Sequence, residues 1–433
     1  MDAWKSSKIL ATLIIAIIGI TLWIGYYLSS YYKGPRWFLS REATASTKPP
    51  SLYQNVNCIV KTAVNTSKKL PEFIELVPGT LVYSAFYDNT NREAPYFRIM
   101  IISETFRPVP IFCHSLCERT KTEPASYKLI REHKKRRHAA FIATCTAPRG
   151  IGRTPGFLDI HAEFEGQVTK ITRVQVQSTA AQNRPHNLTI CVPPIYKGDG
   201  PTRNEIVEFI EMNSILGADH FVFYDVAIPS DVKEVLRHYE SKGVASVLTW
   251  VMPAYMLDFY SIHYHGQMLS IQDCLYRARG TSRFVAFHDL DEFIVPTQEE
   301  TNPELLQRIH KQDISGYRIR SVVFPTQLGK DDDSTELITQ KYFKRTASYF
   351  DTRSKCVVDP QRVSVMGIHD IDSPSEARFK KDWIITEATV YHYRQCAKYE
   401  DLENACKSLI PENRMKLYRD LLKKKVAKVL ALV

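Results

Sequence analysis

Residues 284–296 have the sequence FVAFHDLDEFIVP, in which two apolar runs enclose a cluster of acidic and imidazole side chains. The first run is typical of a buried strand, and His288, Asp289, Asp291 and Glu292 follow it within five positions. Carboxylates crowded at a buried strand end are costly unless a positive charge lies beside them. The stretch therefore predicts a binding site for a cation, or for another positive group, at the end of a core strand.

The residues before this stretch alternate between strand and helix patterns. Thr202 and Glu205 have capping-box spacing for one helix, and Ser230 is the expected N-cap of the next. Such alternation predicts an α/β fold with a mostly parallel sheet, whose ligands bind beyond the carboxyl ends of the strands. Asp225 and the 288–292 cluster both end expected strands, which places them at that edge. The expected strands are 188–192, 220–225, 244–252 and 283–287, and the expected helices are 202–217, 230–243 and 267–280.

The Asp-x-Asp pair, Asp289 and Asp291, determines which chemistry the cluster supports. Two carboxylates at this spacing suit a hard divalent cation that keeps open positions for substrate phosphates. The sequence has no Walker-A loop, and its 17 glycines are few for a dinucleotide-binding fold. It also has no second His and Asp cluster for a two-metal phosphoesterase. A nucleotide-sugar transferase fits best, while solvated charges at an ordinary turn remain the structural alternative.

The N-terminus predicts a membrane anchor. Residues 9–28 contain no charged side chain and are long enough to cross a bilayer as a helix. A cleaved signal peptide is the alternative. Sequons at Asn65 and Asn187, together with nine cysteines, favour a lumenal body. We therefore expect a type II membrane protein with residues 1–8 as a cytoplasmic tail.

The rest of the chain divides by composition. Residues 29–79 are rich in Ser, Thr, Lys and Pro and are interpreted as a stem. Residues 80–184 contain strand patterns at 80–88, 96–103, 141–145 and 171–178, and are expected to form a β-rich accessory domain. Residues 185–433 are expected to form the catalytic domain and to end in a basic helix that packs against it.

The net charge of +10 favours anionic partners without choosing among them. The basic run at residues 134–137 is interpreted as a solvated loop, and nucleic acid is not an expected partner.

Four segments carry a resemblance to a known family: RPHNLTICVPPIYKG (184–198), EFIEMNSILGADHFVFYD (208–225), HGQMLSIQDCLYRARGTSRFVAFHDLDEFIVP (265–296) and YHYRQC (391–396). The sequence resembles glycosyltransferase family 92 over roughly residues 185–396, about half of the chain. The resemblance implies a type II Golgi protein with the GT-A nucleotide-sugar-binding architecture. It also implies an inverting β1,4-galactosyltransferase that uses UDP-galactose.

The resemblance assigns roles to particular residues. It makes Asp289 and Asp291 the pair at a Mn²⁺ or other divalent cation, with Asp291 bound directly and Asp289 facing the ribose or a metal-bound water. Asp225 is expected to meet the uracil base. His392 is expected to complete the metal shell, with His369 as the rival. Candidate bases remain open among Asp351, Asp370, Asp372, Asp382 and Glu387, and candidate diphosphate contacts are Lys197, Arg279 and Arg283.

The expected function is metal-dependent transfer of galactose from UDP-galactose, in β1,4 linkage, onto a glycan acceptor of glycoproteins. A membrane-anchored glycan-binding protein that has lost catalysis is the alternative. The intact Asp289 and Asp291 argue against it, because a binding module has no use for a metal that stabilises a leaving group. The acceptor, the disulfide pairing and the oligomeric state stay open.

Overall fold

The computed structural model describes residues 71–90, 94–114, 122–147, 154–180, 183–196, 200–258, 260–396 and 400–433. All of them belong to one compact unit. No helix within these ranges is long and apolar enough to cross a membrane. The expected anchor at residues 9–28, the sequon at Asn65 and nearly all of the expected stem lie outside the described residues.

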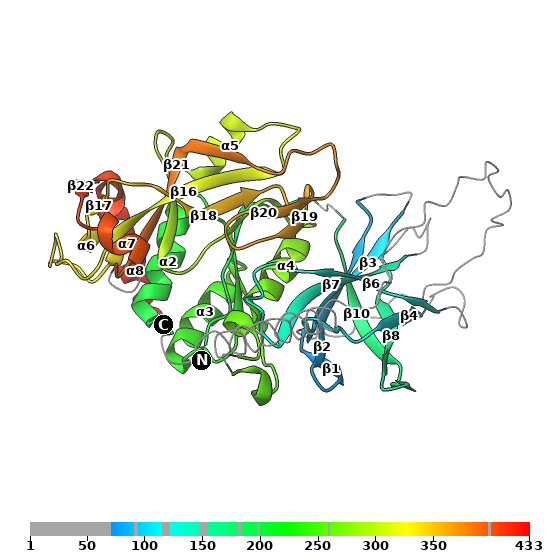
Figure 1. The fold of residues 1–433 in the computed structure, drawn as a ribbon. Coiled ribbons are helices and arrows are strands. Elements are labelled where there is room, and N and C mark those ends of the chain that lie inside the picture. The colour runs from blue at the N-terminus through cyan, green and yellow to red at the C-terminus, as the bar shows by residue number, and fades with distance from the viewer. Residues whose placement is uncertain are drawn as a thin grey trace, which may run out of the picture. The chain divides into compact units, whose positions relative to one another are not determined.

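Ten strands at the N-terminal side form the first sheet, in the order β5-β4-β8-β10-β2-β3-β7-β6, with β1 beside β2 and β9 beside β8 (Figure 1). Its neighbouring strands β2 and β3 are mostly buried, because alternate side chains enter different cores. Leu81 and Tyr83 face one core, and Val82 and Ala85 face the other. The strands are β1 (Ile74–Val77), β2 (Thr80–Asp88), β3 (Tyr96–Glu104), β4 (Ile111–His114), β5 (Thr122–Pro124), β6 (Ser126–Leu129), β7 (His138–Thr146), β8 (Phe157–Phe164), β9 (Gln167–Val168) and β10 (Thr172–Ser178).

The second sheet has eight strands in the order β13-β12-β11-β14-β18-β16-β21-β15. Strands β11 to β14 pair in parallel, as expected from the alternating strand and helix patterns. Strand β18 runs antiparallel to both of its neighbours, and β15 runs antiparallel to β21. The strands are β11 (His186–Cys191), β12 (His220–Asp225), β13 (Ala245–Thr249), β14 (Ser282–Phe287), β15 (Glu292–Pro296), β16 (Gly316–Pro325), β18 (Phe350–Val358) and β21 (Trp383–Arg394).

The prediction of a mostly parallel sheet is therefore wrong, since this sheet is mixed. The alternating pattern stops at residue 287, and parallel neighbours need the long crossovers that helices supply. Beyond that point the chain lacks such a pattern, and the pairings are antiparallel except that of β16 with β21, which is parallel. The expected strand at 244–252 is also shorter, since β13 ends at Thr249.

The helices beside the parallel strands follow the sequence signals closely. The capping box of Thr202 and Glu205 opens α2 (Arg203–Ile215). Ser230 is the first residue of α3 (Ser230–Ser241) rather than its N-cap, which is Pro229. The other helices are α4 (Gln267–Ala278), α5 (Asn302–Ile309), α6 (Ile338–Lys341), α7 (Glu400–Ala405) and α8 (Arg419–Leu430), with 3₁₀ turns η1 (Ala254–Met256), η2 (His263–Gly266) and η3 (Arg414–Tyr418). Short strands complete the fold: β17 (Lys344–Thr346), β19 (Val363–Met366), β20 (Ile371–Pro374) and β22 (Leu409–Pro411).

The two sheets share a hydrophobic core around α4. The indole of Trp250, which follows β13, lies 4.4 Å from the Tyr83 ring of the first sheet and 4.9 Å from the Tyr224 ring of the second. On the other face of the second sheet, α2, α3 and α8 pack in a separate core. The division into an accessory and a catalytic domain at residue 184 stays a prediction.

Three disulfides join described cysteines. Cys113–Cys145 connects β4 to β7, Cys191–Cys274 connects β11 to α4, and Cys396–Cys406 connects the end of β21 to the end of α7. Cys356 in β18 is a buried free thiol.

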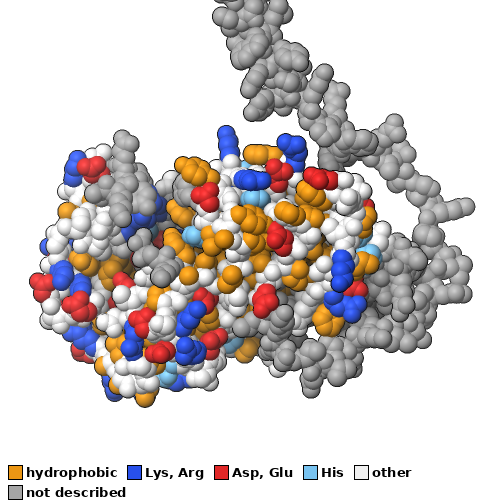
Figure 2. All heavy atoms as spheres, turned by 90° about the horizontal axis from the view of Figure 1, so that it is seen from below, with side chains coloured by type: hydrophobic (Ala, Val, Ile, Leu, Met, Phe, Trp, Pro, Cys, Tyr) orange, Lys and Arg blue, Asp and Glu red, His pale blue; other side chains and the backbone are white. Residues whose placement is uncertain are grey.

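The surface drawn in Figure 2 mixes Lys and Arg with Asp and Glu, and hydrophobic side chains gather near its centre. The positive net charge of the chain is therefore not concentrated on this face.

Candidate active site

Strand pairing assembles the charged cluster. Strand β14 ends at Phe287 and β15 begins at Glu292, so the intervening turn carries Asp289 and Asp291. The antiparallel pairing of β15 with β21 sets His392 opposite Glu292. Ligand oxygens of Asp289, Asp291 and Glu292 lie within 4.8 Å of one another. The structure thus brings together three acidic side chains that the opening stretch predicts as a cluster.

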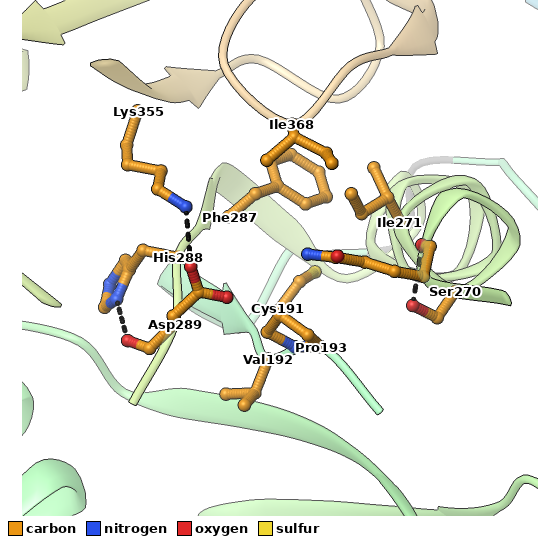
Figure 3. A pocket seen from close by; sticks show the side chains of 11 residues that line it. Cys191, Val192, Pro193, Ser270, Ile271, Phe287, His288, Asp289, Lys355 and Ile368 are labelled. Carbon is orange, nitrogen blue, oxygen red and sulfur yellow. Dashed lines mark hydrogen bonds and ion pairs between the residues drawn. The ribbon is translucent and has the colours of Figure 1, made fainter. Parts of the chain in front are cut away.

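Lys355 is the positive group beside these carboxylates. Its Nζ lies 3.0 Å from Oδ2 of Asp289 and 2.8 Å from Oε2 of Glu292, and Figure 3 shows the ammonium aimed at Asp289. Burial alone would lower the pKa of Lys355, but the charges of Asp289 and Glu292 raise it above its usual value. Burial likewise acts to raise the pKa of Glu292, and the charge of Lys355 outweighs it, so that this pKa is lowered. Lys355 and Glu292 are therefore both charged near neutral pH.

Sequence reasoning missed Lys355. Its position in the segment SKCVV, a lysine inside an apolar strand, is the available signal. Arg353 precedes it by two residues, and Arg394 follows His392 by two on β21; both arginines line the same cleft. Residues two apart on a strand lie on the same face of the sheet, so Arg353 lies on the face of Lys355 and Arg394 on the face of His392.

His288 faces the core instead of the cluster. Its Nδ1 donates to the carbonyl of Asp289 across 3.2 Å, and its ring lies edge-on to Phe209 with centroids 5.6 Å apart. Burial lowers the pKa of His288. The backbone amide of Asp289 donates to Oε2 of Glu292 across 2.9 Å. These contacts fix the turn that presents Asp289 and Asp291.

The cluster lies in a cleft of about 560 Å³. Pro193 and Tyr196 form part of one wall. Tyr264, which precedes α4, and Gln267, the first residue of α4, line the cleft too, as does His369. Cys191 and Ile368 border a much smaller adjoining hollow next to Asp289 (Figure 3). The cleft is large enough for the polar part of a nucleotide sugar, and its polar groups converge on the cluster.

His392 joins the cluster, whereas its rival His369 does not. Nε2 of His392 lies 3.2 Å from Oδ2 of Asp291, and its Nδ1 lies 3.3 Å from Oε1 of Glu292. His369 lines the cleft, but its Nδ1 donates to the carbonyl of Ser354 across 2.9 Å. The geometry favours His392 as the nitrogen ligand of a cation.

The donor atoms fit a hard divalent cation. The side chains of Asp289 and Asp291 are 41% and 42% exposed toward solvent, while that of Glu292 is 1% exposed and held by Lys355. Neighbouring ligands on an ion with bonds of about 2.1 Å lie about 3 Å apart. The 3.2 Å separation of His392 and Asp291 matches that spacing. Asp291 and His392 can therefore be neighbouring ligands of one ion, and Asp289 lies in the same acidic cluster as Asp291.

Asp225 lies outside the cleft lining. Its Oδ1 accepts from the amide of Ile228 across 2.8 Å, and its Oδ2 lies 2.8 Å from Nζ of Lys233. The Asp225 backbone bridges to Ile195, which does line the cleft. Asp225 thus sits behind the Ile195–Tyr196 wall.

None of the five candidate bases lines the cleft, although all are described. Asp370 pairs with Arg131 and Lys381, and Asp382 pairs with Arg318. The other acidic side chains of the lining are Glu205 and Glu208.

Glu208 is a buried carboxylate whose oxygens accept from the amides of Ile338 and Thr339 at 2.8 Å each. Burial raises its pKa to about 7. Glu205 serves the capping box of α2. Both acids thus have structural partners in the described part of the chain, and the base of the reaction is not assigned to either.

The expected diphosphate contacts are not in the described cleft lining. Arg279 is buried and pairs with Asp88 at 3.1 Å. Arg283 lies at the surface, 3.5 Å from Oδ1 of Asn187. Lys197 lies outside the described residues.

Comparison with known proteins identifies a family. The family model for glycosyltransferase family 92 matches residues 186–426, more than half of the chain. Beta-1,4-galactosyltransferase galt-1 of Caenorhabditis elegans is 24% identical over 372 residues, which cover 81% of this chain and 83% of that protein. Galactan beta-1,4-galactosyltransferase GALS2 of Arabidopsis thaliana is 28% identical over 158 residues, 35% of this chain and 29% of the relative.

Among solved structures, residues 1–349 of S. aureus TarS match with a TM-score of 0.27 at 14% identity, covering 49% of this chain and 61% of that one.

Proposed function

Because the chain belongs to glycosyltransferase family 92, we propose that it transfers galactose from UDP-galactose, with inversion and in β1,4 linkage, onto a glycan acceptor. The observation that carries the proposal is the half-buried pair Asp289 and Asp291 on the wall of a cleft of about 560 Å³. The name of the nematode relative, which aligns along 83% of its own length, supports galactose as the sugar.

In this proposal Asp289, Asp291 and His392 hold Mn²⁺ or a similar cation, which when bound neutralises the departing diphosphate. Lys355 keeps Glu292 ionised and holds Asp289 in place. The guanidinium groups of Arg353 and Arg394 line the cleft and attract the anionic donor. GT-A architecture is part of the proposal, supported by the carboxylates at the end of β14.

Asp225 is retained as the proposed contact for uracil. It ends β12 at the same edge of the sheet, directly behind Ile195. Its pairing with Lys233, a side chain that is 41% exposed, would have to rearrange for a base to bind there.

We also propose a Golgi location with the catalytic body in the lumen and residues 9–28 as the anchor. Three disulfides support an oxidising compartment. The exposed position of Asn187 leaves its sequon accessible to glycosylation.

A panel of UDP-sugars, each with and without Mn²⁺, tests the function on the purified full-length chain. We expect UDP release and thermal stabilisation with UDP-galactose and Mn²⁺, and a much smaller effect with other sugars or with a chelator. A folded protein that releases UDP from no sugar, yet binds oligosaccharides, would support the glycan-binding alternative instead.

A further inference from the structure

A line of exposed aromatic side chains leads from the cleft to a group of basic residues. Tyr264 lines the cleft and is 55% exposed, and its ring lies 4.2 Å from that of His263. Tyr260, four residues earlier, is 71% exposed. The guanidinium of Arg136 lies 5.6 Å from the Tyr260 ring. We call Tyr260, Tyr264, Lys134, Lys135 and Arg136 the aromatic–basic surface.

Backbone contacts hold the two segments of this surface together. The amide of Arg137 donates to the carbonyl of Tyr260 across 3.3 Å, and that of His138 donates to Ser261 across 2.8 Å. The indole of Trp250 donates to the carbonyl of His265 across 2.8 Å. The turn that carries the lysines, between β6 and β7, is thereby fixed to the segment before α4.

Five non-glycine residues in these segments adopt left-handed backbone angles, Glu132 with a φ of 66° among them. Tyr264 and His265 have φ values of 40° and 51°, and Lys134 and Lys135 have values of 51° and 55°. Such angles are costly for residues other than glycine and persist only where the surroundings impose them. The backbone strain therefore includes residues of the aromatic–basic surface itself, Tyr264, Lys134 and Lys135.

The four basic residues at 134–137 outnumber the acidic residues of the two segments that form this surface, Glu132 and Asp258. Within the described part of the chain, the side chains of Lys134, Lys135 and Arg137 form no ion pair with an acid, whereas Arg131 pairs with Asp370. Burial, and then the charges of Lys134 and Arg136, lower the pKa of His263 to about 4. The positive field thus reaches the residue next to Tyr264, at the mouth of the cleft.

We propose that the aromatic–basic surface extends the acceptor site and binds a glycan that carries a negative group, such as sulfate or carboxylate, beyond its reacting end. The tyrosine rings stack on successive sugars, and Lys134 and Lys135 bind the anion. The inference rests on the proposed transfer to a glycan. Continuity with the cleft favours a glycan over a lipid surface, because a membrane contact has no need to line the site.

Paired acceptors test the proposal: one galactose-terminated tetrasaccharide, and the same tetrasaccharide with a sulfate on an inner sugar. The measured quantity is the ratio of kcat/KM for the sulfated acceptor to that for the neutral acceptor. For wild type we expect a ratio of about five to ten that falls toward one in high salt. The double variant Lys134→Gln/Lys135→Gln should bring the ratio close to one.

A matched variant removes the same charge elsewhere. Lys424→Gln/Lys428→Gln changes two exposed lysines of α8, which packs in the other core, and should leave the ratio at its wild-type value. Tyr260→Ala should raise KM for both tetrasaccharides more than Tyr260→Phe does, because only the alanine loses the ring. A wild-type ratio of one, or a double variant that keeps the wild-type ratio, would overturn the proposal.

Direct titration separates this inference from the proposed function. If the protein transfers sugar to neither tetrasaccharide, the function fails, and binding of the two tetrasaccharides in UDP and Mn²⁺ then decides the inference. The inference is supported if wild type binds the sulfated tetrasaccharide more tightly than the neutral one, and if this difference is lost in Lys134→Gln/Lys135→Gln but kept in Lys424→Gln/Lys428→Gln. Equal binding of the two tetrasaccharides by wild type overturns the inference. The same double variant is also tested on phosphatidylserine-rich vesicles. If Lys134→Gln/Lys135→Gln loses binding to the vesicles while its acceptor ratio stays at the wild-type value, the surface is a membrane contact and the proposal is overturned.

Discussion

At the residue scale, Lys355 determines how four charges coexist in a largely buried corner. Removing one partner of a buried ion pair leaves an uncompensated charge, at a cost of about 3–5 kcal/mol. We expect Lys355→Met to lower the free energy of unfolding by about that amount, because Lys355 and Glu292 are 2% and 1% exposed. Urea denaturation measures the change.

Two further variants bracket the Lys355 result. Lys380→Met breaks an exposed pair with Asp313, of 64% and 52% exposure, and should cost less than about 1 kcal/mol. Adding Glu292→Gln to Lys355→Met should recover part of the loss. If Lys355→Met and Lys380→Met lower the free energy of unfolding equally, Lys355 is not the buried partner that balances the carboxylates.

Asp291→Asn separates metal binding from folding. The change is nearly isosteric but removes one charge from a crowded acidic cluster. We expect transfer to fall by orders of magnitude, while the melting temperature in chelator stays the same or rises, since carboxylate repulsion is relieved. Mn²⁺ plus UDP should raise the melting temperature of wild type far more than that of the variant. Near-normal transfer by the variant would make the cluster structural.

The third residue-scale prediction concerns the nitrogen ligand. His392→Ala should increase the Mn²⁺ concentration needed for half-maximal activity, because its Nε2 lies 3.2 Å from Asp291. His369→Ala, in the same cleft, should leave that requirement unchanged, since its Nδ1 bonds to Ser354. The opposite pattern would assign the ligand to His369.

The sequence could predict part of this site and not the rest. Asp289 and Asp291 are separated by one residue in the sequence, and their spacing carries the chemistry by itself. Lys355 reaches the same corner only because β18 pairs with β14, a long-range contact with no local signature. Asp225 shows the converse case: its place at a strand end is predicted, but the contacts of its carboxylate with Ile228 and Lys233 are not.

At the scale of elements, Glu208 links α2 to α6 through a titrating contact. Its folded-state pKa of about 7 lies above its ordinary value of 4.5. The folded protein therefore holds a proton that the unfolded chain has released between these values, and the stability contributed by Glu208 falls as pH rises from about 4.5 to about 7.

Glu208→Gln should remove that slope, so that the variant gains stability relative to wild type as pH rises, by up to about 3 kcal/mol. Urea denaturation across this pH range measures the difference, and Glu234→Gln, at an exposed position of α3, is the control. A difference between variant and wild type that does not change with pH would contradict the raised pKa.

The elements also show where pattern reading succeeds. Strands β11, β12 and β14 and helices α2 and α4 were predictable because each carries its own apolar period and its own start or stop signal. The mixed half of the second sheet was not, because β16, β18 and β21 are placed by pairing partners far away in sequence.

At the scale of the whole molecule, the first sheet supports the cleft of the second. The amide of Ile368, a cleft residue, donates to Oε1 of Glu132 across 3.1 Å. Arg131 pairs with Asp370 at 3.2 Å just beyond it. The backbone of residues 137–138 holds the segment before Tyr264 in the same way. Both flanking segments of the cleft thus depend on one β-rich layer.

The topology prediction also belongs at this scale. If the body is lumenal, the exposed Asn187 should carry a glycan in animal cells, and N-glycosidase should increase the electrophoretic mobility of the protein. Asn65→Gln and Asn187→Gln, alone and together, identify which sequon accounts for the shift. Unmodified asparagines at both positions in mass spectra would remove the support from the sequons and leave the topology resting on the anchor and the disulfides.

The core around Trp250 limits how this enzyme can be shortened or recombined. Cutting the chain at residue 185 would strip Tyr83 and the other first-sheet residues from Trp250, Leu275 and their neighbours, and leave a broad apolar face in water. A truncated fragment is therefore expected to aggregate, and grafting the β-rich layer of another protein onto it would require a redesigned interface. Loops at the surface of this molecule can vary one at a time, but its two sheets share a core and must be inherited together.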